Sequence, residues 1–223
     1  MKKIARRTLF RQATSGLLVS AISSAKADVE TFRMPASPRE AMTMLAQGNS
    51  RFQTKQLTSL KEDLQILRTN TVEEQKPFAA ILSCADSRVP VELIFDQTIG
   101  HLFVVRVAGN FATPATIASL EYGAAVLGVK AMLVIGHRNC GAVKATMSAK
   151  SVPGQISSLY QYIHPALKAG ETDANLASRE NSKYQAGLLH ASSPVLGSLI
   201  KEGKLSISAA YYDVETGKVE ILT

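Results

Sequence analysis

The chain has 223 residues, of which 46% are hydrophobic and 19% charged, and its formal net charge is +7. This length and composition are ordinary for a soluble globular chain that forms one domain with a sizeable core. The apolar runs fall far short of the roughly 20 residues that a membrane-spanning helix needs, so stable membrane insertion is not expected.

The positive charge is concentrated in the first 27 residues, which hold six lysine or arginine side chains and no acidic one. Because the rest of the chain is nearly neutral, the sequence argues against a basic surface for nucleic acid. The leader has a basic start, "MKKIARRTLFRQ", a weakly apolar centre, "GLLVSAIS", and an A-x-A cleavage pattern at residues 25–27. Arg6-Arg7 followed by T-L-F resembles a twin-arginine export signal.

We therefore expect residues 1–27 to be a signal peptide that is cleaved before Asp28, which makes the mature protein periplasmic or otherwise exported. An organelle transit peptide is one alternative, since the segment contains arginine and serine but no acid. A disordered basic tail is the other. Residues 28–37, which contain Pro35 and are followed by Pro38, are predicted to form an extended linker, and residues 38–223 a single domain.

A helix is predicted to begin after this linker. Ser37 is a candidate N-cap, with Pro38 at the first helical position and Glu40 at the third, which is a capping-box pattern. The apolar positions that follow recur at helical spacing: Ala41, Met44, Leu45, Gly48 and Phe52. The pattern predicts an amphipathic helix.

The remaining elements alternate between strands and helices. Three apolar segments are predicted as buried strands: 77–84 (PFAAILSC), 101–109 (HLFVVRVAG) and 131–137 (AMLVIGH). Helices are predicted over 113–129, from Cys140 or Gly141 onwards, and within the polar stretch 151–200; segments 205–213 and 218–222 are predicted to form a closing hairpin. This alternation is typical of an α/β fold around a mostly parallel sheet, which binds ligands beyond the carboxyl ends of its strands.

Candidate metal ligands follow two of these strands. Cys84 and His137 each come at a strand end, and Cys140 is spaced H-x-x-C from His137 where a helix is expected to begin. Cysteine and histidine together are the ligand set that zinc prefers. Three protein ligands leave a fourth position open, which is typical of a catalytic zinc site.

Asp86 and Arg88 are explained by the charge of such a site. Two thiolates and a neutral imidazole cancel the charge of zinc, so bound water is acidified less and needs help from neighbouring groups. An ionised Asp86 could accept a hydrogen bond from zinc-bound hydroxide, and Arg88 could keep that carboxylate ionised and oriented.

Other interpretations of these residues remain open. The two cysteines of an exported protein could form a disulfide, and Asp86 with Arg88 could be a plain ion pair. The remaining histidines have no cysteine beside them in the sequence, and we do not predict them as ligands: His101, His164 and His190.

Two segments, "CADSRVP" (84–90) and "GHRNCGAVKA" (136–145), resemble the paired motifs of the β-class carbonic anhydrases. The resemblance runs from Arg39 to the C-terminus and includes "EAMTMLAQGNSRF" (40–52) and "FDQTIGHLFVVRVAGN" (95–110). It implies an α/β domain around a parallel sheet of about four strands, with an antiparallel edge strand and an N-terminal helical arm. It also implies a homodimer or homotetramer.

The resemblance further implies the chemistry. One zinc ion per chain would be held by Cys84, His137 and Cys140, with Asp86 and Arg88 as the catalytic dyad. Gln75 would donate a hydrogen bond to substrate across the dimer interface. The reaction would be the reversible hydration of carbon dioxide to bicarbonate and a proton, by attack of zinc-bound hydroxide, which makes the chain a lyase.

Some members of this family have a closed form, in which the aspartate becomes the fourth zinc ligand, and Asp86 would take that place here. In some of these a tryptophan and an arginine bind regulatory bicarbonate. Arg106 matches that arginine, but Ile81 stands in place of the tryptophan, so this regulation is not expected in its known form.

Two other functions compete with this reading. A zinc hydrolase of the same fold could act on carbon disulfide or carbonyl sulfide. A zinc- or disulfide-stabilised binding module would have no enzymatic activity.

Overall fold

The structure is a computed structural model that describes residues 33–59 and 74–222. The chain divides into two units, Met1–Arg33 and Met34–Thr223, and every element below belongs to the second. The predicted signal peptide and the first half of the predicted linker, residues 28–32, lie outside the described residues.

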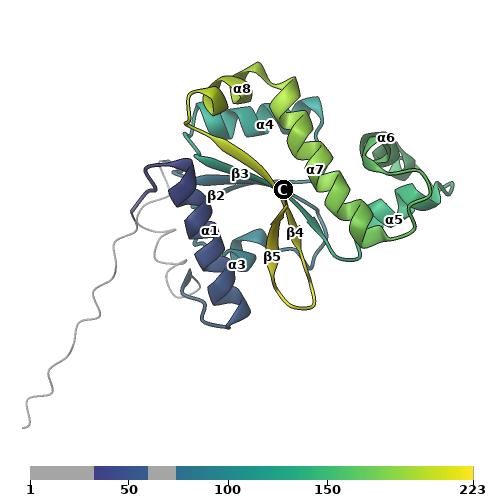
Figure 1. The fold of residues 1–223 in the computed structure, drawn as a ribbon, viewed down its shortest axis with the longest axis horizontal. Coiled ribbons are helices and arrows are strands. Elements are labelled where there is room, and N and C mark those ends of the chain that lie inside the picture. Colours follow the sequence, from purple (N-terminus) through teal and green to yellow (C-terminus); the bar gives the residue numbers. More distant parts are fainter. Residues whose placement is uncertain (1–32, 60–73, 223) are drawn as a thin grey trace, which may run out of the picture. The chain divides into compact units, whose positions relative to one another are not determined.

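Five strands form one sheet in the order β2-β1-β3-β4-β5 (Figure 1). Their bounds are β1 Ala79–Ser83, β2 Leu102–Arg106, β3 Ala131–His137, β4 Ser206–Tyr212 and β5 Val219–Leu222. The first four strands run parallel and β5 is antiparallel to β4. This confirms the predicted mostly parallel sheet with an antiparallel edge strand.

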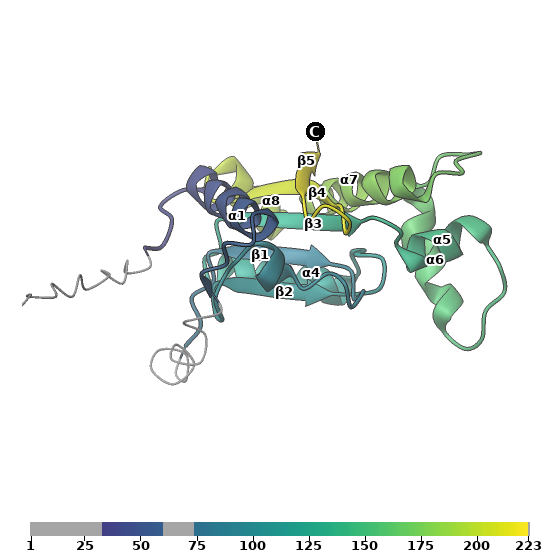
Figure 2. The same ribbon diagram turned by 90° about the horizontal axis from the view of Figure 1, so that it is seen from below.

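Helices cover both faces of this sheet. Their bounds are α1 Pro38–Gln53, α3 Val91–Ile94, α4 Pro114–Ala125, α5 Gly141–Ser148, α6 Tyr160–Ile163, α7 Ala174–Ser192 and α8 Pro194–Lys201, with 3₁₀ turns at Ile156–Leu159 and His164–Ala166. The predicted helices are present, whereas α3 was not predicted because a single turn is too short to show a periodic pattern. Figure 2 shows α5 and α6 beyond the carboxyl ends of the parallel strands.

Two hydrophobic cores explain why the central strands are continuously apolar. Ile81 of β1 faces the core that contains α1 and α3, whereas its neighbour Leu82 faces the core that contains α4 and α8. Leu133 and Val134 of β3 alternate in the same way. Because successive side chains of a strand point to opposite faces, a strand buried on both faces must be apolar at every position.

The N-cap of α1 differs in part from the prediction. The Ser37 hydroxyl accepts a hydrogen bond from the Glu40 N–H (3.2 Å), as expected. The Glu40 carboxylate accepts from the N–H of Ala36 (2.7 Å) rather than from that of Ser37. Only half of the predicted capping box forms, because the carboxylate reaches one residue further back along the chain.

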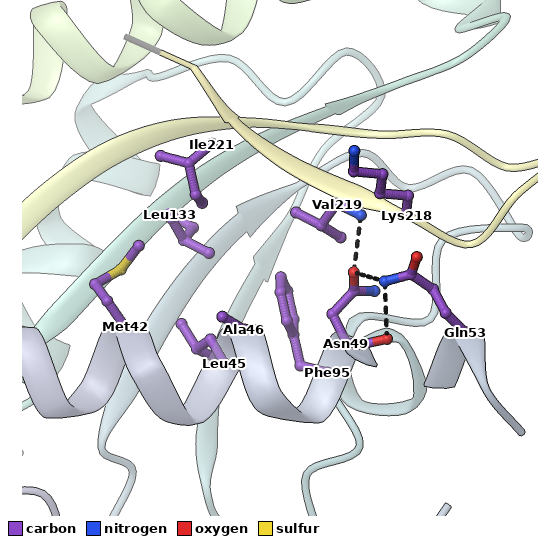
Figure 3. Close-up of a pocket in the computed structure, with 10 residues that line it drawn as sticks. All are labelled: Met42, Leu45, Ala46, Asn49, Gln53, Phe95, Leu133, Lys218, Val219 and Ile221. Atoms are coloured by element: carbon purple, nitrogen blue, oxygen red, sulfur yellow. Dashed lines mark hydrogen bonds between the residues drawn. The ribbon is translucent and has the colours of Figure 1, made fainter. Parts of the chain in front are cut away.

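Asn49 joins α1 to the closing hairpin at one end of a mostly apolar pocket of about 150 Å³ (Figure 3). Its amide donates to the carbonyls of Ile94 (3.1 Å) and Gly217 (2.8 Å). Its side-chain oxygen accepts from the N–H of Val219 (2.9 Å). None of the residues that line this pocket is a predicted site residue, so the pocket belongs to the packing of α1 on β5 rather than to the candidate site.

Candidate metal centre

Cys84, His137 and Cys140 meet at the carboxyl edge of the sheet. Strands β1 and β3 are parallel neighbours, so Cys84, just after β1, and His137, the last residue of β3, lie at the same edge. Cys140 is the N-cap residue of α5. All three side chains are buried, and their ligand atoms lie within 4.8 Å of one another.

The geometry of this cluster fits a tetrahedral metal ion. The two sulfur atoms are 3.9 Å apart. Two thiolates on one tetrahedral zinc, each about 2.3 Å from the metal, would be about 3.8 Å apart. Both cysteines are free thiols in this structure, so they do not form the disulfide that the sequence left open.

The imidazole of His137 presents an unused nitrogen to this cluster. Its Nδ1 lies 3.0 Å from the carbonyl oxygen of Arg138, which can accept the ring proton. Its Nε2 is buried and has no hydrogen-bond partner among the described residues. A proton on Nδ1 leaves a lone pair on Nε2, which is the usual arrangement for a histidine metal ligand.

The two thiols share their protons unequally. Hydrogen bonds with Cys140, which has the largest effect, with His137 and with the Gly109 N–H together lower the pKa of Cys84 to about 4, although burial opposes them. The same sulfur–sulfur contact, together with burial, raises the pKa of Cys140. One thiolate is thus already present near neutral pH, and metal binding has to displace the second thiol proton.

Asp86 lies beside the cluster, held by Arg88. The Arg88 guanidinium donates to both carboxylate oxygens (3.0 and 2.8 Å), and its backbone N–H donates to one of them (2.9 Å). These bonds hold the pKa of Asp86 well below its usual range, although burial opposes them. Asp86 Oδ2 is 3.8 Å from His137 Nε2, so an ionised carboxylate faces the candidate ligands. The closed form, with Asp86 as a ligand, stays a prediction.

Comparison with known proteins shows the family. A family model described as carbonic anhydrase matches residues 79–219. The carbonic anhydrase of Mycolicibacterium smegmatis is 33% identical over 197 residues, which cover 84% of this chain and 95% of that protein. The chain belongs to the carbonic anhydrase family.

Solved β-class carbonic anhydrases share the fold. The Coccomyxa β-carbonic anhydrase in complex with acetazolamide is 26% identical with a TM-score of 0.60, and the match covers 82% of each chain. One of two tetrameric β-carbonic anhydrases from the ascomycete Sordaria macrospora is 20% identical with a TM-score of 0.63, over 82% of this chain and 97% of that one. Within the described part of this chain, no helix is both long and apolar enough to span a membrane.

Arg106 bridges two carbonyl groups of the loop that carries Cys84 and Asp86 in this carbonic anhydrase. Its Nε donates to the carbonyl of Cys84 (3.1 Å) and its Nη2 to the carbonyl of Asp86 (2.7 Å). The sequence had connected Arg106 only with regulatory bicarbonate. A structural role for this residue was missed because carbonyl partners leave no mark in a sequence.

A polar stripe on α7 was also missed. Its four side chains recur at helical spacing and are fully buried against the loops of the site: Ser178, Asn181, Ser182 and Gln185. α7 approaches β3 closely at Gly136, where an added Cβ would lie 2.4 Å from the Ser182 hydroxyl. The periodicity was hidden because the outer face of α7 is polar as well. A buried polar helix face could have been suspected only from its small serines opposite a strand glycine.

The structure does not bring Gln75 to the site of its own chain. Gln75 is exposed and precedes β1, whereas Cys84 follows the other end of that strand. Its predicted contact with substrate requires a neighbouring subunit and stays a prediction.

Proposed function

We propose that this chain is a zinc-dependent carbonic anhydrase that catalyses the reversible hydration of carbon dioxide to bicarbonate and a proton. The observation that carries the proposal is the buried Cys84–His137–Cys140 cluster with Asp86 beside it, in a chain of the carbonic anhydrase family. A structural zinc site has four protein ligands, and it needs no ionised carboxylate beside an open position. The arrangement therefore favours an enzyme over a binding module.

Cys84, His137 and Cys140 would hold one zinc ion per chain. When bound, zinc supplies a Lewis acid that makes water acidic enough to provide a nucleophile near neutral pH. Two thiolates offset the charge of the metal, so the chain has to orient that nucleophile with groups outside the ligand set.

Asp86 and Arg88 would provide this orientation. An ionised carboxylate can only accept hydrogen bonds, so water beside it must donate a proton towards Asp86 and direct a lone pair elsewhere, towards carbon dioxide. Arg88 keeps Asp86 ionised and fixes the plane of the carboxylate through its two-pronged contact. The closed form would have to break these bonds before Asp86 could become a ligand.

Carbon dioxide is favoured as substrate over carbon disulfide and carbonyl sulfide, because the curated relatives are named carbonic anhydrases. We further propose a homodimer or homotetramer in which Gln75 reaches the substrate of the neighbouring subunit. The exposed position of Gln75 and the tetrameric Sordaria macrospora enzymes support this assembly.

The test combines zinc content with stopped-flow hydration of carbon dioxide between about pH 7 and pH 9. We expect one zinc per chain and an activity that rises with pH, because the nucleophile is a deprotonated water. Asp86→Asn should retain zinc and lose at least roughly a hundredfold in kcat/KM. The reason is that the asparagine amide can donate a hydrogen bond at a position where the nucleophile needs an acceptor. Glu220→Gln removes an acid from another arginine pair and should leave the activity unchanged. Zinc without hydration at any pH would contradict the proposal.

We also propose that residues 1–27 direct export by a twin-arginine-like signal, and that residues 38–223 form the carbonic anhydrase domain. The basic start and the A-x-A pattern support export. N-terminal sequencing of the protein made in its host should find Asp28 first. An intact Met1 on most of the protein would rule out cleavage.

A further inference from the structure

We infer that Asn181 is a positioning residue for the metal centre. It holds Gly109 in the orientation in which the Gly109 N–H points at the Cys84 sulfur. The inference rests on the proposed function, because it assumes that Cys84 binds zinc. The hydrogen bonds of Asn181 go to Gly109 and Gln185 rather than to the candidate ligands or the dyad, so Asn181 would act through the backbone.

The first step is the contact between α7 and the loop that follows β2. The Asn181 amide is fully buried and donates to the Gly109 carbonyl at 2.9 Å. Its side-chain oxygen accepts from the Gln185 amide at 3.2 Å, which fixes which way the Asn181 amide faces. A buried carbonyl that loses its donor carries a desolvation cost, so this bond constrains the loop strongly.

The second step is the contact between that loop and the metal centre. The Gly109 N–H donates to Cys84 Sγ at 3.3 Å. Gly109 has φ +93°, and an added Cβ would lie 2.5 Å from Ile163 Cδ1, so both the conformation and the space require glycine. A glycine has many other conformations, and the bond from Asn181 selects the one that aims its N–H at the sulfur.

The third step is the effect of this N–H on a thiolate. A hydrogen bond to a ligand sulfur fixes its orientation and tunes the electron density that it gives to the metal. Removal of partners just outside a metal's ligands typically costs about ten- to a hundredfold in metal affinity. Asn181 is thus expected to govern metal retention, although it lies 72 positions from Gly109 in the sequence.

Asn49 of α1 provides a matched control away from the metal centre. It is also a buried asparagine, whose amide donates to the carbonyls of Ile94 (3.1 Å) and Gly217 (2.8 Å) and whose side-chain oxygen accepts from the Val219 N–H (2.9 Å). None of these backbone groups belongs to a candidate ligand or to the loop of Gly109. Asn49→Leu is therefore the same substitution as Asn181→Leu and removes at least as many buried hydrogen bonds, without a connection to Cys84.

The experiment measures the rate of zinc loss from the holoenzyme to an excess of a chromophoric chelator. We expect Asn181→Leu to lose zinc about tenfold faster than the wild type or more, and Asn49→Leu to stay within about threefold. The cobalt-substituted proteins give a second readout, since the sulfur-to-cobalt absorption band should shift in Asn181→Leu and not in Asn49→Leu. If Asn181→Leu does not fold, Asn181→Asp keeps the shape but places an acceptor opposite the Gly109 carbonyl, and the same results are expected.

Equal rates of zinc loss and identical cobalt spectra in the Asn181 and Asn49 variants would overturn the inference. A wild-type protein without zinc, or with zinc and no hydration of carbon dioxide, would instead contradict the proposed function. The two failures are therefore distinguishable.

Discussion

Arg106 shows how one side chain can set the shape of a catalytic loop without touching its reactive groups. Its guanidinium reaches from β2 to the carbonyls of Cys84 and Asp86, which flank a single residue. Two bonds from one rigid, planar group fix the separation of these carbonyls, whereas a lysine would offer a single charged point. The position of Asp86 relative to Cys84 therefore depends on Arg106.

We predict that Arg106→Met lowers kcat/KM by roughly ten- to a hundredfold, because small displacements of positioning groups are costly in catalysis. Methionine keeps much of the apolar stem, so the change removes the hydrogen bonds more than the packing. The measurement is stopped-flow hydration at low bicarbonate concentration. A purely regulatory Arg106 would leave this activity unchanged and alter only the response to added bicarbonate, which would contradict the prediction.

A suitable control is Arg179→Met. Arg179 lies over the Tyr211 ring at 4.0 Å and pairs with Glu220, and none of these residues belongs to the loop of Cys84 and Asp86. Its loss should reduce activity far less than the loss of Arg106.

The predicted site residues differ from the missed ones in how far away along the chain their partners lie. Cys84, Asp86 and Arg88 lie in one short segment, and His137 and Cys140 in another, so local spacing reveals them. Arg106 and Asn181 act on backbone groups 22 and 72 positions away. Backbone partners are the same for every residue type, so only the folded structure identifies them.

At the scale of elements, Asp96 ties three segments together. It follows α3 and accepts hydrogen bonds from Arg51 near the end of α1 and from the N–H and hydroxyl groups of Thr58 and Ser59. Burial alone would raise the pKa of Asp96, but these hydrogen bonds together lower it. The carboxylate thus anchors the C-terminal end of α1 and the segment after it to the core.

We predict that Asp96→Asn lowers the free energy of unfolding by about 2 kcal/mol at pH 7, because the buried donors lose a charged acceptor. A lowered pKa contributes stability that is fully present above the ordinary aspartate value of about 3.9 and is lost as pH falls through the folded-state value. The difference between wild type and variant should therefore shrink between about pH 5 and pH 3. Urea unfolding at one protein concentration measures it.

Asp213→Asn is the comparison for this prediction. Asp213 also pairs with an arginine, Arg138, but its side chain is 30% exposed, so water replaces part of the lost interaction. An Asp213→Asn variant that loses as much stability as Asp96→Asn would contradict the proposed anchoring role of Asp96. A difference between wild type and Asp96→Asn that does not change with pH would contradict it as well.

Elements with strong periodicity were predicted best. Strand β3 has the predicted bounds, and α1 begins at Pro38, directly after the predicted N-cap Ser37. The stretch 151–200 was predicted only as helical, and the structure divides it into 3₁₀ turns and separate helices. The start of α8 has the same local signal as the start of α1, a serine N-cap followed by proline at Ser193-Pro194, whereas the two 3₁₀ turns have no side-chain cap.

At the scale of the whole molecule, the sheet order makes the site. The alternation of strands and helices predicted a parallel α/β sheet, but it did not predict that β1 and β3 are neighbours with β2 outside them. This pairing brings Cys84 to His137. Pairing between strands far apart in the sequence is decided by the packing of both sheet faces. The strand pattern alone therefore could not predict that these two residues lie together, whereas the paired motifs did.

The proposed export route makes the order of metal loading and oxidation important. The sulfurs of Cys84 and Cys140 are 3.9 Å apart, and each would have to move only about 1 Å to form a disulfide. Hydrogen bonds, chiefly with Cys140, lower the pKa of Cys84 to about 4, so Cys84 is a thiolate that can take part in exchange near neutral pH. Zinc would occupy both sulfurs and prevent this reaction.

We predict that removal of zinc makes the folded protein sensitive to oxidised glutathione. The two thiols would give up two protons and two electrons to form the Cys84–Cys140 disulfide, while the oxidant is reduced to two molecules of glutathione. Thiol titration in denaturant should find two thiols in the treated zinc-loaded protein and none in the treated zinc-free protein. Treated zinc-free Cys140→Ser should instead gain one glutathione by mass, because Cys84 then has no second cysteine to resolve the mixed disulfide. Two remaining thiols in the treated zinc-free wild type would show that the site is closed to this oxidant, which would contradict the prediction.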